Sequence, residues 1–350
     1  MTTPLNAILL GYGYAAQTFH APLISNCADL RLYGMVSSKP EQVLADWPQA
    51  RHWHSLEQAL QDEAVDLVVI ATPNALHYPQ AEAALRAGKN VVVDKPFTVT
   101  VSEAQQLAAL ADRLGLLLSV FHNRRWDADF LTLKPLLESA RLGRISQFVS
   151  HFDRYRPEVR QRWREQGGAG SGLWYDLGPH VLDQALQLFG PPLAVSAYLA
   201  QQRQQAQTTD YFHVQLRYPS THVVLHGPCL VSGGIPRFAV HGELASYTKY
   251  GLDTQEADLK LGKQPGGPAW GLDPQPGLLH VQTDGTVQSE TIANRCGDYR
   301  CYYQQVAAAI RGDADNPVTA SEAASVMDWL ERAVLSAAQG REVSAEEVLS

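Results

Sequence analysis

The segment that decides the fold class of this chain is Asn6-Ala7-Ile8-Leu9-Leu10-Gly11-Tyr12-Gly13-Tyr14-Ala15-Ala16. Its first five residues form a short apolar run, which is typical of a buried strand. A helical pattern follows over residues 17–24, and a second apolar strand is expected at residues 30–36. Strand, glycine turn, helix and strand in this order predict one βαβ unit.

The same alternation continues to about residue 122. Strands are predicted at residues 65–71, 91–93 and 116–121, and helices at residues 56–60, 78–87 and 102–114, the last capped by Ser102 and ended by Gly115. Strands this apolar are usually covered by helices on both faces, so we expect a parallel, doubly wound Rossmann sheet of α/β class.

The pattern changes after His122. A helix is expected at residues 130–139, a strand at 145–151, and period-two strands at 213–218 and 222–225, with closing helices at 302–310 and 321–338. This order predicts an α+β domain with a mainly antiparallel sheet covered by helices on one face. We therefore expect a dinucleotide-binding domain over residues 1–122 and a substrate-binding and dimerisation domain over residues 123–350.

Composition narrows the class of partner. The 350 residues carry a formal charge of −8, and the 28 basic residues are scattered, so no stripe for nucleic acid is expected. No apolar run approaches the roughly 20 residues of a membrane span, and the first ten residues lack the features of a signal peptide. Four dispersed cysteines do not suggest a disulfide framework. We expect a cytoplasmic protein that binds small molecules.

The glycine turn predicts a dinucleotide site, because the pattern Gly11-x-Gly13-x-x-Ala16 lies between a strand and a helix. Gly11 allows the tight turn, Gly13 lets the backbone approach a pyrophosphate, and Ala16 permits close packing of helix on strand. Tyr14 and Ala15 lie at the start of that helix and join the predicted site.

Cofactor choice depends on the end of the second strand. Ser37, Ser38 and Lys39 stand there, where a carboxylate would bind a ribose 2′-hydroxyl. Two hydroxyls and an ammonium suit a 2′-phosphate, so we expect NADP to be preferred, with NAD as the alternative.

Three motifs now support a family resemblance: Thr72-Pro73-Asn74-Ala75-Leu76-His77, Asp94-Lys95-Pro96, and the run from Gly170 to His180. In this order the chain resembles the Gfo/Idh/MocA oxidoreductases over essentially its whole length. Asp94 replaces a glutamate of the family pattern, and Ser171 interrupts its glycines. The resemblance implies a cis Lys95–Pro96 bond. It also implies cofactor contacts from Thr72, Pro73, Asn74, His77, Asp94, Lys95, Asn123 and Arg124.

The candidate catalytic residues are Lys95, Asp176 and His180. Oxidation of a secondary alcohol needs a base near the hydroxyl, and imidazole titrates near neutrality, so His180 is the expected base. Asp176 lies four residues earlier and shares a helix face with His180 if the helix has begun there. Lys95 is expected to bind the substrate oxygen and stabilise alkoxide charge.

A hydroxyl-rich substrate fits this set of polar groups. Trp163 and Tyr299 are further candidates for substrate contact, together with Lys95, Asp176 and His180. The segments 249–253 and 266–271 resemble the NADP-dependent scyllo-inositol dehydrogenases of the family. We therefore expect a dehydrogenase acting on a CH–OH group of a sugar or cyclic polyol.

Other interpretations remain open. Asp176, His180 and Asp183 are spaced like metal ligands, but a metal would leave Lys95 and the glycine turn unexplained, so no metal is expected. A sensor of the same fold that binds a dinucleotide without catalysis is the alternative function, and an NAD-dependent hydrolase is a third. The uncovered face of the second sheet predicts a homodimer or homotetramer.

Overall fold

The computed structural model describes residues 3–348, with the exception of the side chain of Trp163, and it divides into two compact units. The first unit contains the chain up to Trp126 together with Thr254–Gly271 and Asp298–Met327. The second contains Asp127–Asp253, Leu272–Gly297 and the chain from Asp328 onward. Two later segments thus belong to the first unit, although the sequence assigned everything after residue 122 to the second domain.

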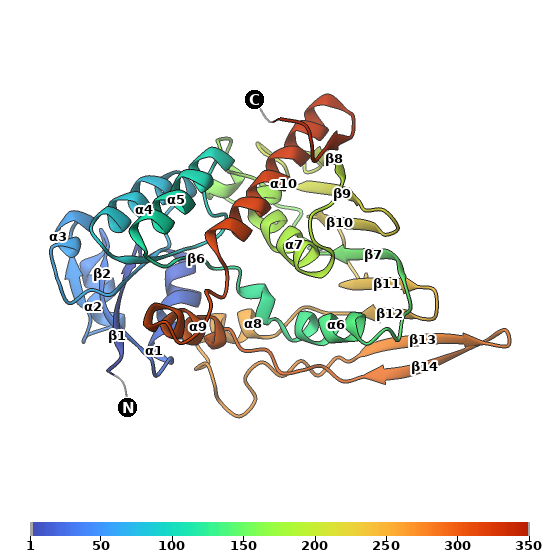
Figure 1. The fold of residues 1–350 in the computed structure, drawn as a ribbon, viewed down its shortest axis with the longest axis horizontal. Coiled ribbons are helices and arrows are strands. Elements are labelled where there is room, and N and C mark those ends of the chain that lie inside the picture. The colour runs from blue at the N-terminus through green and yellow to red at the C-terminus, as the bar shows by residue number, and fades with distance from the viewer. Residues whose placement is uncertain (1–2, 349–350) are drawn as a thin grey trace. The chain divides into compact units, whose positions relative to one another are not determined.

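A parallel sheet forms the centre of the first unit (Figure 1). Within the described residues it has six strands in the order β3-β2-β1-β4-β5-β6. The strands are β1 (Leu5–Leu10), β2 (Leu30–Val36), β3 (Arg51–Trp53), β4 (Leu67–Ile70), β5 (Asn90–Val93) and β6 (Leu118–Val120). The strand order runs outward in both directions from β1 and β4, which confirms the predicted doubly wound sheet.

Helices cover both faces of this sheet. α4 (His77–Arg86) packs on β4 and β5 and lies beside α5 (Val101–Leu114), whereas α1 (Ala21–Ser25) and α9 (Arg300–Arg311) pack on β2 (Figure 1). The other helical segments are η1 (Ala16–His20), α2 (Pro40–Asp46), α3 (Leu56–Leu60), η2 (Asn74–Leu76), η3 (Asn123–Trp126) and α8 (Gln255–Lys260). The helices therefore shield the centre of the sheet from solvent, and every residue of β4 is fully buried.

The cap of α5 differs from the prediction. The structure caps this helix with Thr100, whose hydroxyl accepts from the Glu103 backbone N–H while the Glu103 carboxylate accepts from the Thr100 N–H. This reciprocal pair is a capping box. Ser102 lies inside the helix and accepts from Gln106 instead, so the predicted Ser102 cap is wrong by two residues.

The second unit is built on a mainly antiparallel sheet, as predicted. Within the described residues its nine strands have the order β14-β13-β12-β11-β7-β10-β9-β8-β15, and only the β7–β10 pair is parallel. The strands are β7 (Ile145–His151), β8 (Ala194–Ala200), β9 (Tyr211–Arg217), β10 (His222–Pro228), β11 (Phe238–Gly242), β12 (Ser246–Lys249), β13 (Gly277–Thr283), β14 (Thr286–Ile292) and β15 (Val343–Ser344).

One face of this sheet packs on helices. α6 (Ala128–Glu138) and α7 (Leu173–Phe189) lie on the same side of the strands (Figure 1), and α7 contacts β9 and β10. Phe212, Val214 and Leu216 of β9 are fully buried on that side. Their neighbours along the strand face the opposite side of the sheet, the open face. α10 (Ala320–Gln339) closes the helical set, and the short η4 (Trp163–Glu165) precedes α7.

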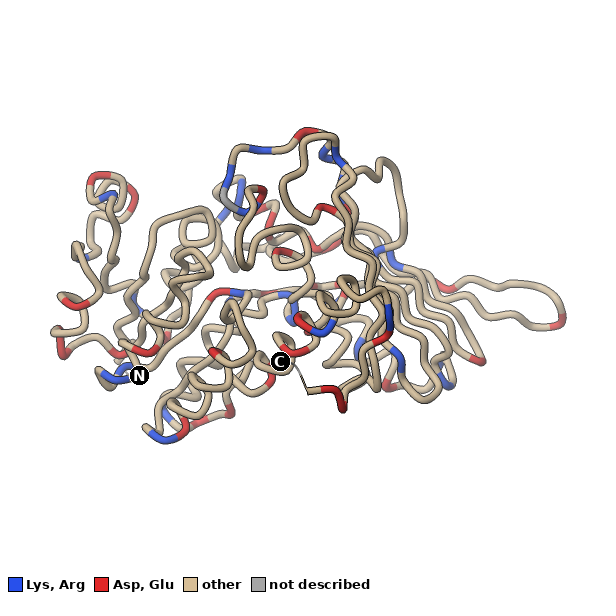
Figure 2. The backbone as a smooth tube through the Cα atoms, turned by 90° about the horizontal axis from the view of Figure 1, so that it is seen from above, with Lys and Arg blue, Asp and Glu red and all other residues tan. Residues whose placement is uncertain are grey.

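Acidic and basic residues are interspersed along the chain in both units (Figure 2). Within residues 3–348, no helix is both long enough and apolar enough to cross a membrane.

Candidate functional site

In the turn after β1, Gly11 is constrained by neighbouring atoms of the protein itself. This residue has φ +90°, and a Cβ there would lie 3.0 Å from the Ala71 carbonyl oxygen and 3.1 Å from the Thr72 Cγ2. Both the backbone conformation and the close approach make a side chain at this position strained. Gly11 is therefore required by the fold itself.

Gly13 is different, because a Cβ there would meet no described heavy atom within 4 Å. Helical residues begin at Tyr14, directly after it, and continue into η1 and α1, and Gln17 N donates to the Gly13 carbonyl at 3.0 Å. Open space beside a glycine backbone at the start of a helix suits a phosphate group. The described residues therefore fit a dinucleotide at the position that the sequence predicted.

The end of β2 presents the predicted cofactor-selecting residues. The Ser37 hydroxyl accepts from Lys39 N at 3.0 Å, and its carbonyl lies 2.7 Å from His52 Nε2. Ser38 and Lys39 are exposed. Ser37 is thus fixed in the turn, while the Lys39 side chain is open to solvent or to an anionic ligand.

The loops after β4 and β5 are tied together by His77. Its ring is fully buried, with Nδ1 2.9 Å from the Pro96 carbonyl oxygen and Nε2 2.9 Å from the Thr72 carbonyl oxygen. Burial lowers the pKa of His77, which favours the neutral ring, and a neutral ring carries one N–H that can donate to one of these two carbonyl oxygens. The Lys95–Pro96 bond is cis, as the resemblance implied. His77 therefore supports the loop that carries Lys95.

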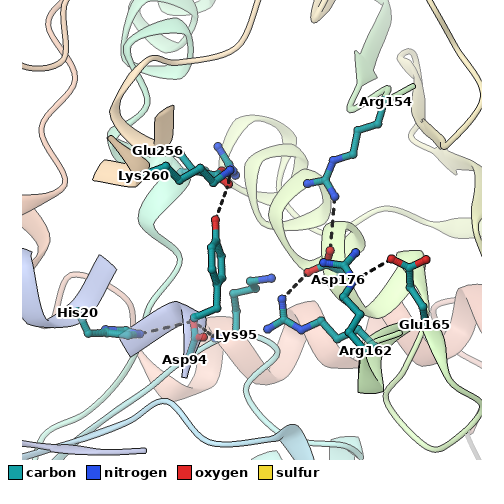
Figure 3. Close-up of polar contacts among 12 residues, drawn as sticks. His20, Asp94, Lys95, Arg154, Arg162, Glu165, Asp176, Glu256 and Lys260 are labelled. Atoms are coloured by element: carbon teal, nitrogen blue, oxygen red, sulfur yellow. Dashed lines mark hydrogen bonds and ion pairs between the residues drawn. The ribbon is translucent and has the colours of Figure 1, made fainter. Parts of the chain in front are cut away.

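Lys95 belongs to a series of buried polar contacts that the sequence did not reveal (Figure 3). The Asp94 Oδ1 accepts from Lys95 N at 2.8 Å and lies 3.8 Å from His20 Nε2. His20 Nδ1 lies 2.6 Å from the hydroxyl of Tyr303, and both of these side chains are fully buried. His20 and Tyr303 are 283 positions apart, so no local spacing reveals this contact.

A second cluster forms around Glu256 of α8 (Figure 3). Arg124 Nη2 donates to Glu256 Oε2 at 2.6 Å, and Lys260 Nζ donates to Oε1 at 2.5 Å. The hydroxyl of Tyr14, a predicted cofactor residue, lies 3.4 Å from the same oxygen Oε1. Burial raises the pKa of Glu256, but Arg124 and Lys260 outweigh it and lower that pKa to about 2. Glu256 therefore links Tyr14, at the glycine turn, to Arg124 in η3.

In the second unit, the glycine-rich run shapes the start of α7. Gly172 has φ +92°, and a Cβ there would lie 2.7 Å from Thr208 Oγ1. A Cβ on Gly178 would lie 2.6 Å from the ring of Trp174, whose indole N–H donates to the Leu330 carbonyl at 3.1 Å. The helix begins at Leu173, directly after Gly172, so Asp176 and His180 lie about one helical turn apart, as predicted.

Arginine side chains surround Asp176. Arg164 Nη1 donates to Asp176 Oδ1 at 3.0 Å, and Arg154 Nη1 lies 3.6 Å from Oδ2 (Figure 3). Glu165, hydrogen-bonded to Arg162 at 2.7 Å, closes the same pocket together with Arg203. The sequence had assigned Asp176 a polar role without finding these guanidinium groups. Each carboxylate oxygen of Asp176 therefore faces one guanidinium group and acts as an acceptor in this cluster.

His180 is buried, and its ring stacks on Phe152 with centroids 6.4 Å apart and planes at 22°. The guanidinium groups of Arg154 and Arg237 each lie 5.3 Å from the Phe152 centroid. Phe152 thus supports the predicted base on one side.

The remaining predicted residues lie as follows. Asn74, Asn123 and Arg124 are buried in η2 and η3 of the first unit, and Tyr299 is fully buried at the start of α9 with its ring 6.4 Å from that of Phe19. The Trp163 side chain lies outside the described part of the structure. Substrate contact by Tyr299 and Trp163 stays a prediction.

The Glu256 cluster yields a test. Because its pKa is lowered from 4.5 to about 2, Glu256→Gln should reduce the free energy of unfolding at pH 7 by about 1–3 kcal/mol. That contribution is complete above about pH 5 and disappears as the pH falls from about 4.5 towards 2. Urea unfolding of both proteins at several pH values measures it.

The control for this test is Glu82→Gln, which breaks the exposed pair with Arg86 and should change stability by less than about 0.5 kcal/mol. A Glu256→Gln deficit that is the same at pH 7 and pH 3 would contradict the assigned ion pairing.

Comparison with known proteins agrees with this architecture. The family model described as "Oxidoreductase family, NAD-binding Rossmann fold" matches residues 5–122, and the one described as "Oxidoreductase family, C-terminal alpha/beta domain" matches residues 134–345.

Similar proteins match over nearly the whole chain. The chain is 51% identical to the uncharacterized oxidoreductase YdgJ of Escherichia coli (strain K12), covering 96% of this chain and 97% of that protein. It is 41% identical to scyllo-inositol 2-dehydrogenase (NADP(+)) IolW of Bacillus subtilis (strain 168), covering 97% and 95%. The solved structure of YPO2259 from Yersinia pestis superposes with a TM-score of 0.95 at 48% identity, covering 100% of this chain and 99% of that one. The chain therefore belongs to the Gfo/Idh/MocA family of oxidoreductases, with an NAD-binding Rossmann domain at its N-terminus.

Proposed function

We propose that this protein is an NADP-preferring dehydrogenase that oxidises a secondary hydroxyl of a cyclic polyol or sugar, of the scyllo-inositol kind. The proposal depends mainly on the open space at Gly13. The buried ring of His77, which contacts the loop that carries Lys95, supports it as a second observation. The name of the IolW relative supports both the substrate class and the cofactor. The absence of a carboxylate among Ser37, Ser38 and Lys39 supports NADP independently.

Each candidate residue has a defined role in this proposal. The His180 imidazole accepts the hydroxyl proton of the substrate. The Lys95 ammonium binds the reacting oxygen and stabilises its developing negative charge. The Asp176 carboxylate accepts a hydrogen bond from a neighbouring substrate hydroxyl. The dinucleotide, when bound, supplies the hydride acceptor.

A substrate panel tests the proposal. Inositols, aldoses and linear polyols are offered with NADP and with NAD, and nicotinamide absorbance is followed. Turnover of an inositol is expected, with a higher kcat/KM for NADP. His180→Ala should lower kcat/KM about 100-fold or more, because it removes the general base.

Two comparisons complete the panel. His222→Ala, an exposed histidine at the start of β10, should leave the rate unchanged. Binding of NADP without turnover of any compound would contradict the enzyme proposal and favour the alternative, a sensor of the same fold.

The glycine turn offers a separate test of dinucleotide binding. Gly13→Ala should weaken NADPH affinity tenfold or more, about 1.4 kcal/mol, without lowering the melting temperature, because its Cβ meets no described atom of the chain. Gly11→Ala should lower the melting temperature even without ligand, since φ is +90° there. Fluorescence titration and thermal unfolding separate the two, and unchanged affinity in Gly13→Ala would refute the pyrophosphate position.

We also propose that the chain forms a homodimer or homotetramer through the open face of the second sheet. Tyr198 on this face is 63% exposed, which suits burial against a second copy. Gel filtration with light scattering should give at least twice the 38.5 kDa of one chain. A monomer at micromolar concentration would refute this assembly.

A further inference from the structure

Two histidines and an aspartate converge on the open face of the second sheet, in residues that the proposed function does not use. His151 ends β7 and is paired in register with His226 of the parallel strand β10. Paired residues of neighbouring strands point to the same face. Asp153 follows two residues after His151 and brings its carboxylate to the same point.

The distances among these three groups are short and nearly equal. The Nδ1 atoms of His151 and His226 are 3.2 Å apart. Asp153 Oδ2 lies 3.2 Å from the first of these nitrogens, and Oδ1 lies 3.2 Å from the second. The side chains of His151, His226 and Asp153 are 19%, 16% and 11% exposed in the single chain, so the cluster is partly buried.

This spacing matches the edge of a coordination tetrahedron. Zinc binds imidazole nitrogen and carboxylate oxygen at about 2.0–2.1 Å, which puts neighbouring ligand atoms about 3.3 Å apart in tetrahedral geometry. The two imidazole nitrogens stand close to this separation, and each lies at a similar distance from one Asp153 oxygen, although the oxygen differs between the two. One ligand atom from each residue lies within 4.8 Å of the others, so a small rotation of the carboxylate completes the set. Two imidazoles in a set of three donors favour a transition metal such as zinc over magnesium or calcium, which prefer oxygen ligands.

We propose that His151, Asp153 and His226 form a binding site for a divalent transition metal ion, zinc in the first place, with water as the remaining ligand. The Tyr211 hydroxyl, 3.3 Å from His226 Nε2, serves as a second contact that orients this ring. The site differs from the Asp176, His180 and Asp183 set that the sequence analysis considered and set aside. His151 and His226 are 75 positions apart, so their spacing in the sequence gives no signal.

The position of the site gives the metal a structural role. Along the extended segment after β7, His151 and Asp153 face the metal, whereas Phe152 and Arg154 contact His180 and Asp176 of α7. A metal ion at this point fixes the backbone that carries Phe152 and Arg154. We therefore expect the ion to hold the support of the predicted base in place without touching the substrate.

Metal titration tests the site directly and does not depend on the proposed function. The full-length protein, freed of metal with a chelator, is titrated with Zn²⁺ by calorimetry and with Co²⁺ by visible absorption. One equivalent per chain is expected, with the intense d–d bands of a tetrahedral Co²⁺ site. Zn²⁺ should also raise the melting temperature.

Variants locate the ion. His226→Gln and Asp153→Asn should each weaken Zn²⁺ binding more than about 100-fold, since even loss of an outer contact costs 10–100-fold. His222→Gln, on the same strand and exposed, is the matched control and should bind as the parent does. Far-ultraviolet circular dichroism confirms that each variant is folded.

The proposal fails if the parent protein binds no Zn²⁺ or Co²⁺ at about 100 µM, whatever the variants do. It also fails if binding survives unchanged in folded His226→Gln, because the ion then lies elsewhere. A hydrogen-bonded His–Asp–His cluster without metal affinity would be the correct description in the first case.

Discussion

The parallel pairing of β1 with β2 on one side and β4 on the other is the constraint on which the first unit depends. Parallel strands end at the same edge of a sheet, and their crossover helices must cover both faces. The turn at Gly11, the loop at Thr72 and the loop at Lys95 therefore meet along one edge, although they are more than 80 positions apart from first to last. The His77 ring lies between the last two of these loops, within 2.9 Å of a carbonyl oxygen of each.

In the second unit, alternate residues of one extended segment face opposite sides of the sheet and make different contacts. Residues 151 and 153 face the open side, and residues 152 and 154 face α7. Gly172, at the start of the helix, leaves room for Thr208, and Gly178 leaves room for the ring of Trp174 one turn earlier in the same helix. Backbone shape and side-chain chemistry are thus set together in a few residues around Asp176 and His180.

Local patterns predicted most of the elements. Apolar runs and glycine or proline boundaries gave residues 30–36, 56–60 and 145–151 with the bounds that the structure has. The cap of α5 was misplaced because Ser102 and Thr100 both fit a cap, and only the Glu103 side chain distinguishes them. Strands β11 to β14 were not predicted. β14 is exposed along nearly its whole length and has no apolar face in the sequence, whereas β11 is only five residues long and presents two buried apolar residues, Phe238 and Val240.

The predicted site residues were found by motif, and their partners were not. Glu256, Tyr303 and Arg154 contact Tyr14, His20 and Asp176, yet each is a common residue in an unremarkable stretch of sequence. Such contacts depend on tertiary packing, since the two partners come from distant segments. The loop motifs are therefore enough to assign a chain to this family, whereas the charged residues that contact those loops are found only in the three-dimensional structure.

The two glycines of the turn after β1 are under different structural constraints. Gly11 is fixed by the chain's own atoms, so a substitution there is penalised in every molecule that folds, with or without a ligand. Gly13 borders space that no described atom of the protein fills, so selection acts on it only through what binds there. In a relative that no longer binds a dinucleotide, we therefore expect position 13 to accept other residues while position 11 stays glycine.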